Sequence, residues 1–309
     1  VGLTILATDI EDKVLVLEMG MRGLGQIENL SKYSEPDIAV ITNIGTAHIG
    51  LLGSKKNITH AKCEISKFLN PKGVVIIPAN DPFLEKTLKE FWKGRVIKVK
   101  LLNIENQKES FKKDDNLRGF YNPSNKTILI EENTFEISFE GFHNASNFLF
   151  AYAVAKELGI DFASFNKFDF VSLGGRNKIL KSVKTTIYDE SYNASPESVK
   201  ACIKNLLEKP RNKFFIFGSM QELGKESEKY HKEIFNLINN SDIEKCLFIC
   251  DKENEKIYSN YLKDKNKFLV LNNIKDVPQE INKSTKKGDS ILIKGSRCWQ
   301  LEKIIELIN

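Results

Sequence analysis

The chain has 309 residues, enough to bury sizeable cores and to suggest two domains. Its 41% apolar and 28% charged content are ordinary for a globular protein, and no apolar run approaches the roughly 20 residues of a membrane span. The net charge of +5 is spread through mixed Lys/Glu runs, which argues against a dedicated nucleic-acid surface. Five cysteines without a C-x-x-C pair argue against disulfide frameworks and zinc sites and favour a reducing cytoplasm.

Val1 is not a Met and stands within apparent secondary structure, so we expect the true start of the protein to lie upstream of it. Residues 14–18, VLVLE, are a short apolar run that predicts a buried parallel strand closed by Glu18. A carboxylate at the end of such a strand lies at the ligand edge of the sheet. A simple solubilising charge is also common at that position.

Residues 36–64 hold the first group of candidate site residues. The apolar run 38–44 predicts a buried parallel strand, and a polar loop carrying His48 follows it. We expect the next helix to carry Lys62 and Glu64 on its first turns. Taken singly, such a His is usually solvated or satisfied in a core, and such a Lys or Glu usually lies on an exposed face. Together, beyond the carboxyl end of a strand, they indicate a site.

The middle of the chain predicts more strands. Residues 74–78 form a further apolar run. Residues 95–104 and 127–140 alternate apolar and polar side chains with a period of two, which predicts antiparallel strands. Residues 105–116 between them are charged and poor in apolar side chains, so we expect a solvated loop.

A helix and a domain boundary follow. Residues 141–147, GFHNASN, open an apolar helix that we predict over residues 148–158, and an Asn at a helix start is first of all a cap. The glycines of LGGR, at residues 173–176, break the pattern. We place the boundary there, which gives domains over residues 1–173 and 174–309.

From residue 185 strands and helices alternate five times, which predicts a small doubly wound α/β domain. Polar side chains at residues 189–193, DESYN, follow its first strand and therefore face the ligand edge of the sheet. A basic loop at residues 294–297, KGSR, follows the last strand. Such a loop is either plain surface or a receptor for an anionic substrate.

In their order and spacing, these segments resemble the motifs of the Mur ligase family over essentially the whole chain: PDIAVITNIGTAHIGLLGS…AKCEIS, GFHNASN, GGR, DESYNASP and KGSR. The resemblance implies a central P-loop-type ATPase domain with a mostly parallel sheet and a C-terminal Rossmann-like doubly wound domain. The phosphate loop itself, G-x-x-x-x-G-K-[ST], does not occur in this sequence. The resemblance places that loop before the segment VGLTIL, so we expect the 309 residues alone to be inactive.

Within the family, the resemblance is strongest to members that add D-alanyl-D-alanine to UDP-N-acetylmuramoyl-tripeptide in peptidoglycan synthesis. It implies a cytoplasmic, ATP- and Mg²⁺-dependent amide ligase that works through an acyl phosphate, and we expect a monomer without nucleic-acid or membrane partners. The segments SYNASP and QELG…H favour this activity over third-residue-adding ligases and folylpolyglutamate synthases. A non-catalytic nucleotide-binding module stays open as an alternative, since the phosphate loop is absent.

The resemblance also implies roles for single residues. Glu18 and His48 would hold Mg²⁺, and Lys62 would become a carbamate that adds an oxygen ligand, or else pair directly with a phosphate. Arg176 would reach the nucleotide phosphates and join Lys62 and His48 as a catalytic group. The other nucleotide-binding candidates are His143, Asn144, Asn147 and Asp189. The substrate-binding candidates are Ser191, Tyr192, Asn193, Lys294, Ser296 and Arg297. The sequence departs from the family pattern at Gln26, Ser195 and Ser219, where Glu, Asn and Asp are usual.

Overall fold

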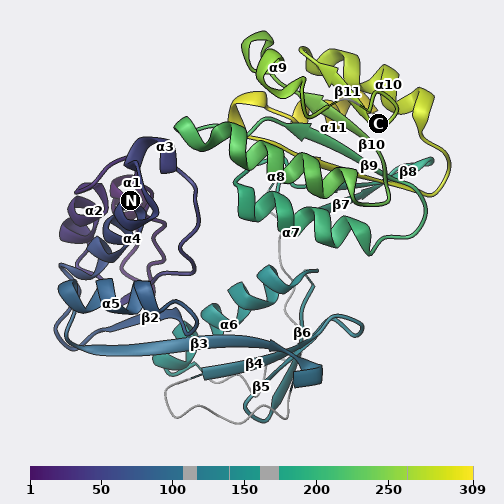
Figure 1. Ribbon diagram of the computed structural model, residues 1–309. Coiled ribbons are helices and arrows are strands. Elements are labelled where there is room, and N and C mark those ends of the chain that lie inside the picture. The colour runs from purple at the N-terminus through teal and green to yellow at the C-terminus, as the bar shows by residue number, and fades with distance from the viewer. Residues whose placement is uncertain (107–116, 139, 161–173, 263, 309) are drawn as a thin grey trace. The chain divides into compact units, whose positions relative to one another are not determined.

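The computed structural model describes residues 1–106, 117–138, 140–160, 174–262 and 264–308. The chain divides into two compact units, Val1–Asp169 and Phe170–Asn309, each with its own sheet (Figure 1). Both sheets are mostly parallel and carry helices, which confirms the predicted α/β class. The expected domain boundary between residues 173 and 174 stays a prediction, because residues 161–173 lie outside the described ones.

The sheet of the first unit has the order β1-β2-β3-β4-β5-β6 among the described residues. Its strands are β1 (Ile38–Val40), β2 (Val74–Pro78), β3 (Arg95–Asn103), β4 (Leu117–Asn122), β5 (Thr127–Ile130) and β6 (Asn133–Glu136). β1 to β4 pair in parallel, and β4, β5 and β6 pair antiparallel. The helices are α1 (Gly2–Leu6), α2 (Gln26–Ser34), α3 (Ile49–Leu52), α4 (Lys55–Cys63), α5 (Pro82–Phe91) and α6 (Phe142–Glu157), with 3₁₀ turns η1 (Glu64–Ser66) and η2 (Ile104–Asn106).

Helices cover both faces of this sheet, which explains why β2 is a continuous apolar run rather than an alternating one. Val75 and Ile77 of β2 pack in one core with residues of α2, α4 and α5. Ile76, between them, belongs to a second core that includes Leu149 and Ala153 of α6. The strand predicted at residues 74–78 is confirmed.

The two predictions of antiparallel strands in the middle of the chain differ in their outcome. β5 and β6 are antiparallel, as the alternation in residues 127–140 predicted. β3 is parallel to both of its neighbours, so the antiparallel prediction for residues 95–104 is wrong. Alternation with a period of two reports a strand and its faces, but it carries no information about the direction of the partner strand. Of the loop predicted at residues 105–116, η2 takes the first part, and residues 107–116 lie outside the described ones.

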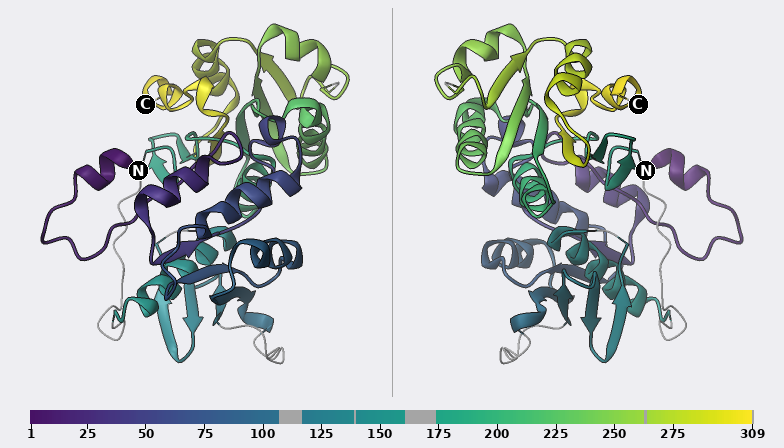
Figure 2. Two further views of the ribbon diagram at one scale, coloured as in Figure 1. Left: turned by 90° about the vertical axis from the view of Figure 1, so that its left-hand side faces the viewer. Right: turned by 90° about the vertical axis from the view of Figure 1, so that its right-hand side faces the viewer.

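The predicted strand at residues 14–18 is wrong. The segment has no regular structure, and Val14, Leu15 and Val16 are 49%, 41% and 81% exposed. Figure 2 shows it as part of a loop outside the sheet. A strand needs a hydrogen-bonding neighbour, and in the described residues β1 pairs only with β2. The same edge position explains why β1 ends at Val40, earlier than the apolar run 38–44 suggested.

The sheet of the second unit has the order β11-β10-β9-β12-β8-β7 among the described residues. Its strands are β7 (Lys178–Lys181), β8 (Thr185–Asp189), β9 (Lys213–Gly218), β10 (Ile243–Ile249), β11 (Phe268–Leu271) and β12 (Asp289–Lys294). The helices are α7 (Pro196–Leu207), α8 (Ser227–Asn239), α9 (Lys252–Tyr258), α10 (Val277–Ser284) and α11 (Glu302–Ile308), with 3₁₀ turns η3 (Gly224–Glu226), η4 (Ile274–Asp276) and η5 (Arg297–Trp299). The five predicted strand–helix units are confirmed, and the antiparallel edge strand β7 is an addition that the sequence did not predict.

This unit is a three-layer sandwich with a fully buried central strand. All six residues of β9 are buried, and their side chains alternate between the two faces. Phe214 and Ile216 pack with residues of α10 and α11, whereas Phe217 contacts Phe235 of α8. The carboxyl ends of β8, β9 and β12 therefore meet at one edge, above a rigid core. None of the helices in the described part of the chain combines the length and apolar character that crossing a membrane requires.

Candidate functional site

The lysine candidate of the first unit contacts the loop that follows β1. Lys62 lies in the last turn of α4, and its Nζ donates a hydrogen bond of 2.9 Å to the carbonyl oxygen of Asn43. His48 lies in the same loop as Asn43, half-buried, with a left-handed φ of 64° at the N-cap of α3. The predicted helix therefore places Lys62 against the loop of His48, although on its last turn rather than its first turns.

Glu64 has a structural task and does not join Lys62 and His48. It lies beyond the end of α4, is 2% exposed, and its two carboxylate oxygens accept the N–H groups of Gly25 at 2.8 Å and Glu28 at 3.3 Å. Those N–H groups belong to the start of α2, where an acidic group stabilises the unpaired donors and the helix dipole. The expectation that Glu64 shares a site with Lys62 is wrong, because its carboxylate caps α2 instead.

Glu18 lies in the exposed loop described above, without a strand to fix it. Among the described residues no group of three or more His, Cys, Asp and Glu side chains could hold a metal ion. Mg²⁺ in nucleotide sites commonly takes only one or two protein ligands, together with phosphate oxygens and water. The assignment of Glu18 and His48 as Mg²⁺ ligands stays a prediction, and one carboxylate with one imidazole is compatible with a metal that shares its coordination with a nucleotide.

The segment with the nucleotide-binding candidates His143, Asn144 and Asn147 forms the first turns of α6. The helix begins at Phe142 rather than at residue 148, directly after Gly141 with its φ of 98°. Asn144 is buried, and its side-chain amide donates 2.6 Å to the carbonyl oxygen of Glu140, so it fixes the start of the helix. Asn147 lies one turn further along and is exposed, so it is the better placed of the two asparagines to meet a ligand.

In the second unit, the loop after β8 is tied back to the last residue of the strand. Asp189 is 3% exposed, and its Oδ1 accepts hydrogen bonds from the N–H of Ser191 at 3.1 Å and from its hydroxyl at 2.6 Å. The neighbouring Tyr192 and Asn193 are exposed. Asp189 and Ser191 therefore shape this loop, and Tyr192 and Asn193 are presented on its surface.

The loop after β12 reaches the same edge. Lys294 is 4% exposed, and its Nζ donates to the carbonyl oxygens of Asn193 at 3.0 Å and Glu190 at 3.5 Å. The hydroxyl of Ser296 accepts the N–H of Gln221 at 2.8 Å, which links the loops after β12 and β9. All six predicted substrate-binding residues thus lie in the loop after β8, in the loop after β12 or at the end of β12.

The guanidinium groups of Arg176 and Arg297 approach the Tyr192 ring. Arg176 lies over the ring with its Cζ 4.0 Å from the centroid, and Arg297 lies 6.0 Å from it. Arg297 also forms an ion pair of 2.8 Å with Glu302. A positively charged group is stabilised over an aromatic face, so Tyr192 gathers two cations at the ligand edge.

The loops after β9 and β12 approach so closely that only glycine fits. A Cβ on Gly295 would lie 2.7 Å from the Cα of Gly218, and one on Gly218 would lie 2.8 Å from the Trp299 ring. The indole N–H of Trp299 donates 3.0 Å to the carbonyl oxygen of Ser219, which holds the two loops together. Ser219, where the family pattern has Asp, is 1% exposed and thus belongs to the support of this edge.

His231 supports the loop after β9 from within the buried core. The sequence indicates this residue only as the His of the motif QELG…H. It is fully buried, and its Nε2 accepts the N–H of Met220 at 2.9 Å. Its Nδ1 lies 2.8 Å from the carbonyl oxygen of Ser227 and must therefore donate, so the imidazole is neutral. Burial lowers the pKa of His231 from 6.5 to about 4. The Phe and Tyr rings around it explain this desolvation.

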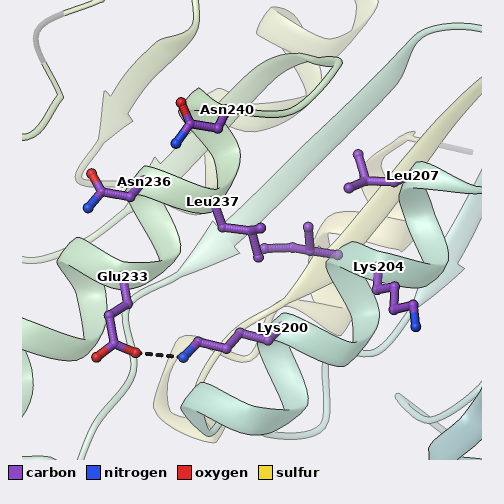
Figure 3. Close-up of a pocket in the computed structure, with 8 residues that line it drawn as sticks. Lys200, Lys204, Leu207, Glu233, Asn236, Leu237 and Asn240 are labelled. Atoms are coloured by element: carbon purple, nitrogen blue, oxygen red, sulfur yellow. Dashed lines mark hydrogen bonds and ion pairs between the residues drawn. The ribbon is translucent and has the colours of Figure 1, made fainter.

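A separate groove of about 650 Å³ opens between α7 and α8 (Figure 3). Lys200 and Glu233 form an ion pair of 2.5 Å across it. Its lining residues are Lys200, Ile203, Lys204, Leu207, Glu233, Asn236, Leu237 and Asn240. None of the candidate site residues belongs to this lining, so the groove is distinct from the ligand edge.

Two family descriptions match this chain. Residues 1–155 match the Mur ligase middle domain, and residues 175–297 match the Mur ligase, glutamate ligase domain. The chain belongs to the Mur ligase family. This confirms the resemblance found in the sequence.

Curated relatives and solved structures agree with the Mur ligase assignment. The UDP-N-acetylmuramoyl-tripeptide–D-alanyl-D-alanine ligase of Bacillus subtilis is 33% identical over 98% of this chain and 66% of its own length. The ligase of the same name from Buchnera aphidicola is 31% identical over 99% of this chain and 67% of its own length. The crystal structure of the MurF ligase of Thermotoga maritima in complex with ADP has a TM-score of 0.81 at 25% identity, covering 99% of this chain and 69% of that one. The chain thus spans about two thirds of the length of these relatives.

More distant neighbours share the fold alone. The folylpolyglutamate synthase of Mycobacterium tuberculosis, solved with ADP and AMPPCP, has a TM-score of 0.62 at 14% identity. This likeness is weaker than that to the MurF ligase in both identity and TM-score. It therefore does not favour the folylpolyglutamate synthase alternative.

Proposed function

We propose that this chain supplies the central and C-terminal domains of an ADP-forming ligase that adds D-alanyl-D-alanine to UDP-N-acetylmuramoyl-tripeptide. The observation that carries the proposal is the 33% identity to the B. subtilis ligase of that activity over 98% of the chain. The relatives from Buchnera and Rickettsia, which match 99% of the chain, have the same name. This agreement favours the ligase over the alternative of a non-catalytic nucleotide-binding module.

The proposed reaction joins a carboxylate to an amine in two steps. A carboxylate oxygen of the tripeptide attacks the γ-phosphorus of ATP, the bond to the β–γ bridging oxygen breaks, and ADP leaves. The amine of D-alanyl-D-alanine, after losing a proton, attacks the carbonyl carbon of the acyl phosphate, and phosphate leaves. Because ATP and the carboxylate are both anionic, the site must offset their repulsion with fixed positive charge.

The basic residues of the ligand edge suit that requirement. Arg176 is assigned to the nucleotide phosphates, for which its forked donors are suited. Lys294 and Arg297, at the carboxyl end of β12, are assigned to the anionic peptide substrate. On the nucleotide itself, Asn147 is assigned to adenine and Asp189 to the ribose, parts of ATP that do not react. Mg²⁺ bound with the phosphates would add charge neutralisation, with Glu18 and His48 as its protein ligands.

Lys62 is assigned to the reacting groups because it lies against the loop of His48. As a carbamate it would offer an anionic oxygen ligand for Mg²⁺, and as an ammonium it would pair with a phosphate. The hydrogen bond from Lys62 Nζ to the Asn43 carbonyl holds the side chain in that place in either case. We also propose a cytoplasmic monomer, and the five free cysteines fit a reducing compartment.

The experiment that tests this function uses the full-length protein and the substitution Lys62→Ala. We expect it to reduce ATP-dependent amide formation at least about 100-fold, as for loss of one preorganised charged group, without changing the fold. Lys56→Ala, on the exposed side of the same helix, is the matched control and should keep full activity.

Adding a small carboxylate such as formate separates the two forms of Lys62. Partial recovery of the Lys62→Ala enzyme supports the carbamate, and no recovery supports the ammonium. Normal activity of Lys62→Ala would contradict the assigned role. A wild-type enzyme that makes no amide from ATP, tripeptide and D-alanyl-D-alanine would contradict the function.

A further inference from the structure

The turn that carries Arg176 has an unusual backbone. Gly175 and Asn177, on either side of it, have left-handed φ values of 75° and 48°. Non-glycine residues adopt this region rarely and at an energetic cost, so such a turn persists only where surrounding contacts fix it. A Cβ on Gly175 would also lie 2.8 Å from the backbone nitrogen of Tyr192. The turn therefore presses directly against the loop after β8.

Two hydrogen bonds attach this turn to the loop after β8. The N–H of Tyr192 donates 3.0 Å to the carbonyl oxygen of Gly175. The N–H of Asn177 donates 3.1 Å to the Oε1 of Glu190. Between these two bonds, the Arg176 guanidinium lies over the Tyr192 ring at 4.0 Å. The main chain on both sides of Arg176 is thus clamped to the loop after β8.

Glu190 is a firm anchor for this clamp. Its own N–H donates 2.9 Å to the carbonyl oxygen of Ile293, which extends the pairing of β8 with β12 by one residue. Burial raises the pKa of the Glu190 carboxyl, and the charge of Lys294 and the N–H of Asn177 partly offset that effect. A carboxylate is costly to bury in such a place, and its bond to a main-chain N–H is the compensating contact.

We propose that Glu190 is the positioning residue of Arg176, holding the turn at residues 175–177 so that the guanidinium is presented on the face of the Tyr192 ring at the ligand edge. Arg176 is therefore carried by the C-terminal unit as a pre-oriented group, rather than by a free linker. The proposal rests on the proposed function for the ligand, since that function assigns Arg176 to the ATP phosphates. Glu190 itself touches neither nucleotide nor peptide in this scheme.

The clamp is tested first without any ligand, by NMR on the 309-residue chain. The Tyr192 ring current should shift the Arg176 side-chain protons upfield, and Tyr192→Leu should abolish that shift and so assign it. Glu190→Ala should move these protons to random-coil positions and lower the exchange protection of the Asn177 amide by about tenfold, the loss of one hydrogen bond to a charged group. Glu190→Gln keeps a carbonyl acceptor for Asn177 and should preserve both signals.

Several controls keep the result decisive. Glu208→Ala removes an exposed carboxylate at the C-terminal end of α7 and should change neither the Arg176 shifts nor the Asn177 exchange protection. Gly175→Ala leaves Glu190 intact but cannot fit its Cβ, so it should displace Arg176 in the same way even if Glu190→Ala fails to fold. An unchanged Arg176 shift in a folded Glu190→Ala protein would overturn the proposal, and so would a folded Glu190→Gln protein that loses the shift.

The link to ATP is tested in the full-length enzyme by a double-mutant cycle. Glu190→Ala and Arg176→Ala should each raise the KM for ATP, and the double variant should be no worse than Arg176→Ala alone, because both act through one guanidinium. An unchanged KM for ATP in Arg176→Ala, together with the expected NMR result, would contradict the assignment of Arg176 to ATP and leave the positioning role standing. Additive KM effects would contradict the claim that Glu190 acts through Arg176. If a folded Glu190→Ala protein keeps both the Arg176 proton shifts and the Asn177 exchange protection of the wild type, the positioning role is contradicted whatever the kinetic results.

Discussion

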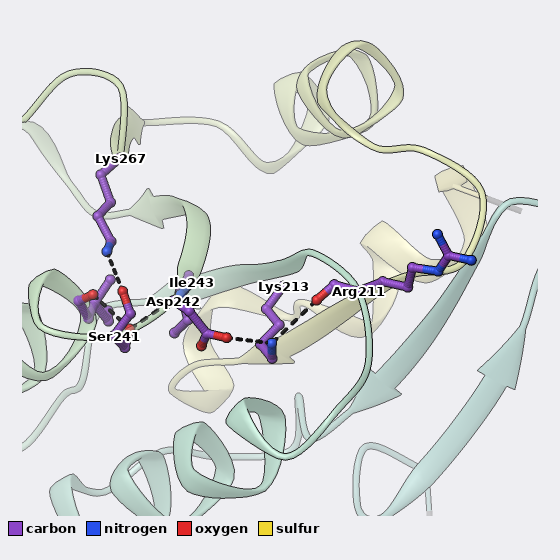
Figure 4. A network of polar contacts seen from close by, with 7 residues as sticks. Arg211, Lys213, Ser241, Asp242, Ile243 and Lys267 are labelled. Carbon is purple, nitrogen blue, oxygen red and sulfur yellow. Dashed lines mark hydrogen bonds and ion pairs between the residues drawn. The ribbon is translucent and has the colours of Figure 1, made fainter.

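The two ends of the C-terminal sheet each hold a buried lysine, but the two charges are balanced differently. At the amino end, Lys213 of β9 is 6% exposed, and its Nζ lies 2.7 Å from Oδ2 of Asp242 (Figure 4). At the carboxyl end, Lys294 of β12 is 4% exposed, and its Nζ donates to the main-chain carbonyls of Asn193 and Glu190. One lysine has a carboxylate in contact, whereas the other binds main-chain carbonyls and its charge partly offsets the burial that raises the pKa of the Glu190 carboxyl.

The surroundings of the two lysines extend the contrast. The amino end is closed by further internal contacts, with Lys213 also donating to the Arg211 carbonyl and Lys267 donating to that of Ser241 (Figure 4). The carboxyl end instead gathers Arg176 and Arg297 around an exposed tyrosine. A buried charge costs stability, and Lys294, Arg176 and Arg297 together give this edge basic groups with which an anionic ligand can pair.

The largest expected effect concerns the support beneath the carboxyl end. His231 is buried as a neutral imidazole and holds the N–H of Met220, so protonation of its Nε2 would remove that hydrogen bond. The pKa is 6.5 when unfolded and about 4 when folded. A lowered folded pKa contributes stability that is fully present above the unfolded pKa and is lost as the pH falls toward the folded pKa. We therefore expect about 3 kcal/mol of unfolding free energy to disappear between pH 7 and pH 4 through this group.

Urea unfolding over that pH range measures this loss, with His231→Gln as the comparison. The variant should be less stable at pH 7, but the difference from wild type should shrink toward pH 4, because only the wild type loses the histidine contribution. NMR titration of the His231 ring gives the folded pKa directly. A folded pKa above 6 would contradict the neutral, buried imidazole.

The sequence predicted which loops form the carboxyl end better than it predicted the residues that support them. Residues 189–193 and 294–297 follow buried strands, and parallel strands bring such loops to one edge whatever the details of packing. The clamp between Glu190 and the Gly175 turn could not be predicted, because it depends on one main-chain hydrogen bond and one bond from a main-chain N–H to the Glu190 carboxylate, between segments with no shared pattern. The role of His231 in holding Met220 could not be predicted either, since no local signal separates a core histidine from a site histidine.

In the first unit, the failures have a different origin. Residues 14–18 have a strand pattern, but the described sheet offers no partner at that edge, and pattern alone cannot supply one. The sequence groups Glu64 with Lys62 because the two are two residues apart on an expected helix. Side chains two residues apart on a helix do not face each other, and the backbone stays helical from α4 through Cys63 into η1. Glu64 therefore faces α2 while Lys62 faces the loop after β1, although the two are close in sequence.

The next prediction compares the two lysines through function. Lys294→Met in the full-length ligase should lower kcat/KM for the peptide substrate by about 10- to 100-fold, since hydrogen bonds to charged groups contribute about 1.5–3 kcal/mol. Lys213→Met, which makes the same chemical change at the other end of the sheet, should leave kcat/KM unchanged. Steady-state kinetics with the peptide and ATP varied separately measures both. Equal losses of kcat/KM in the two variants would contradict a functional difference between the two ends of the sheet.

The smallest expected effect is on stability at the amino end. The Asp242 side chain is 66% exposed although its partner is buried, so Lys213→Met leaves a carboxylate that water can solvate. The variant also removes the desolvation of a buried ammonium, and a pair of this kind contributes at most about 1 kcal/mol.

The hydrogen bond from Lys213 is the largest cause that lowers the pKa of the Asp242 carboxyl. That contribution is present above the unfolded pKa and fades as the pH falls, so the small difference between wild type and Lys213→Met should vanish in acid. Removing one partner of a fully buried ion pair costs more than about 3 kcal/mol of unfolding free energy. A loss of that size in Lys213→Met at pH 7 would show that the amino end depends on its ion pair far more than the exposure of Asp242 implies.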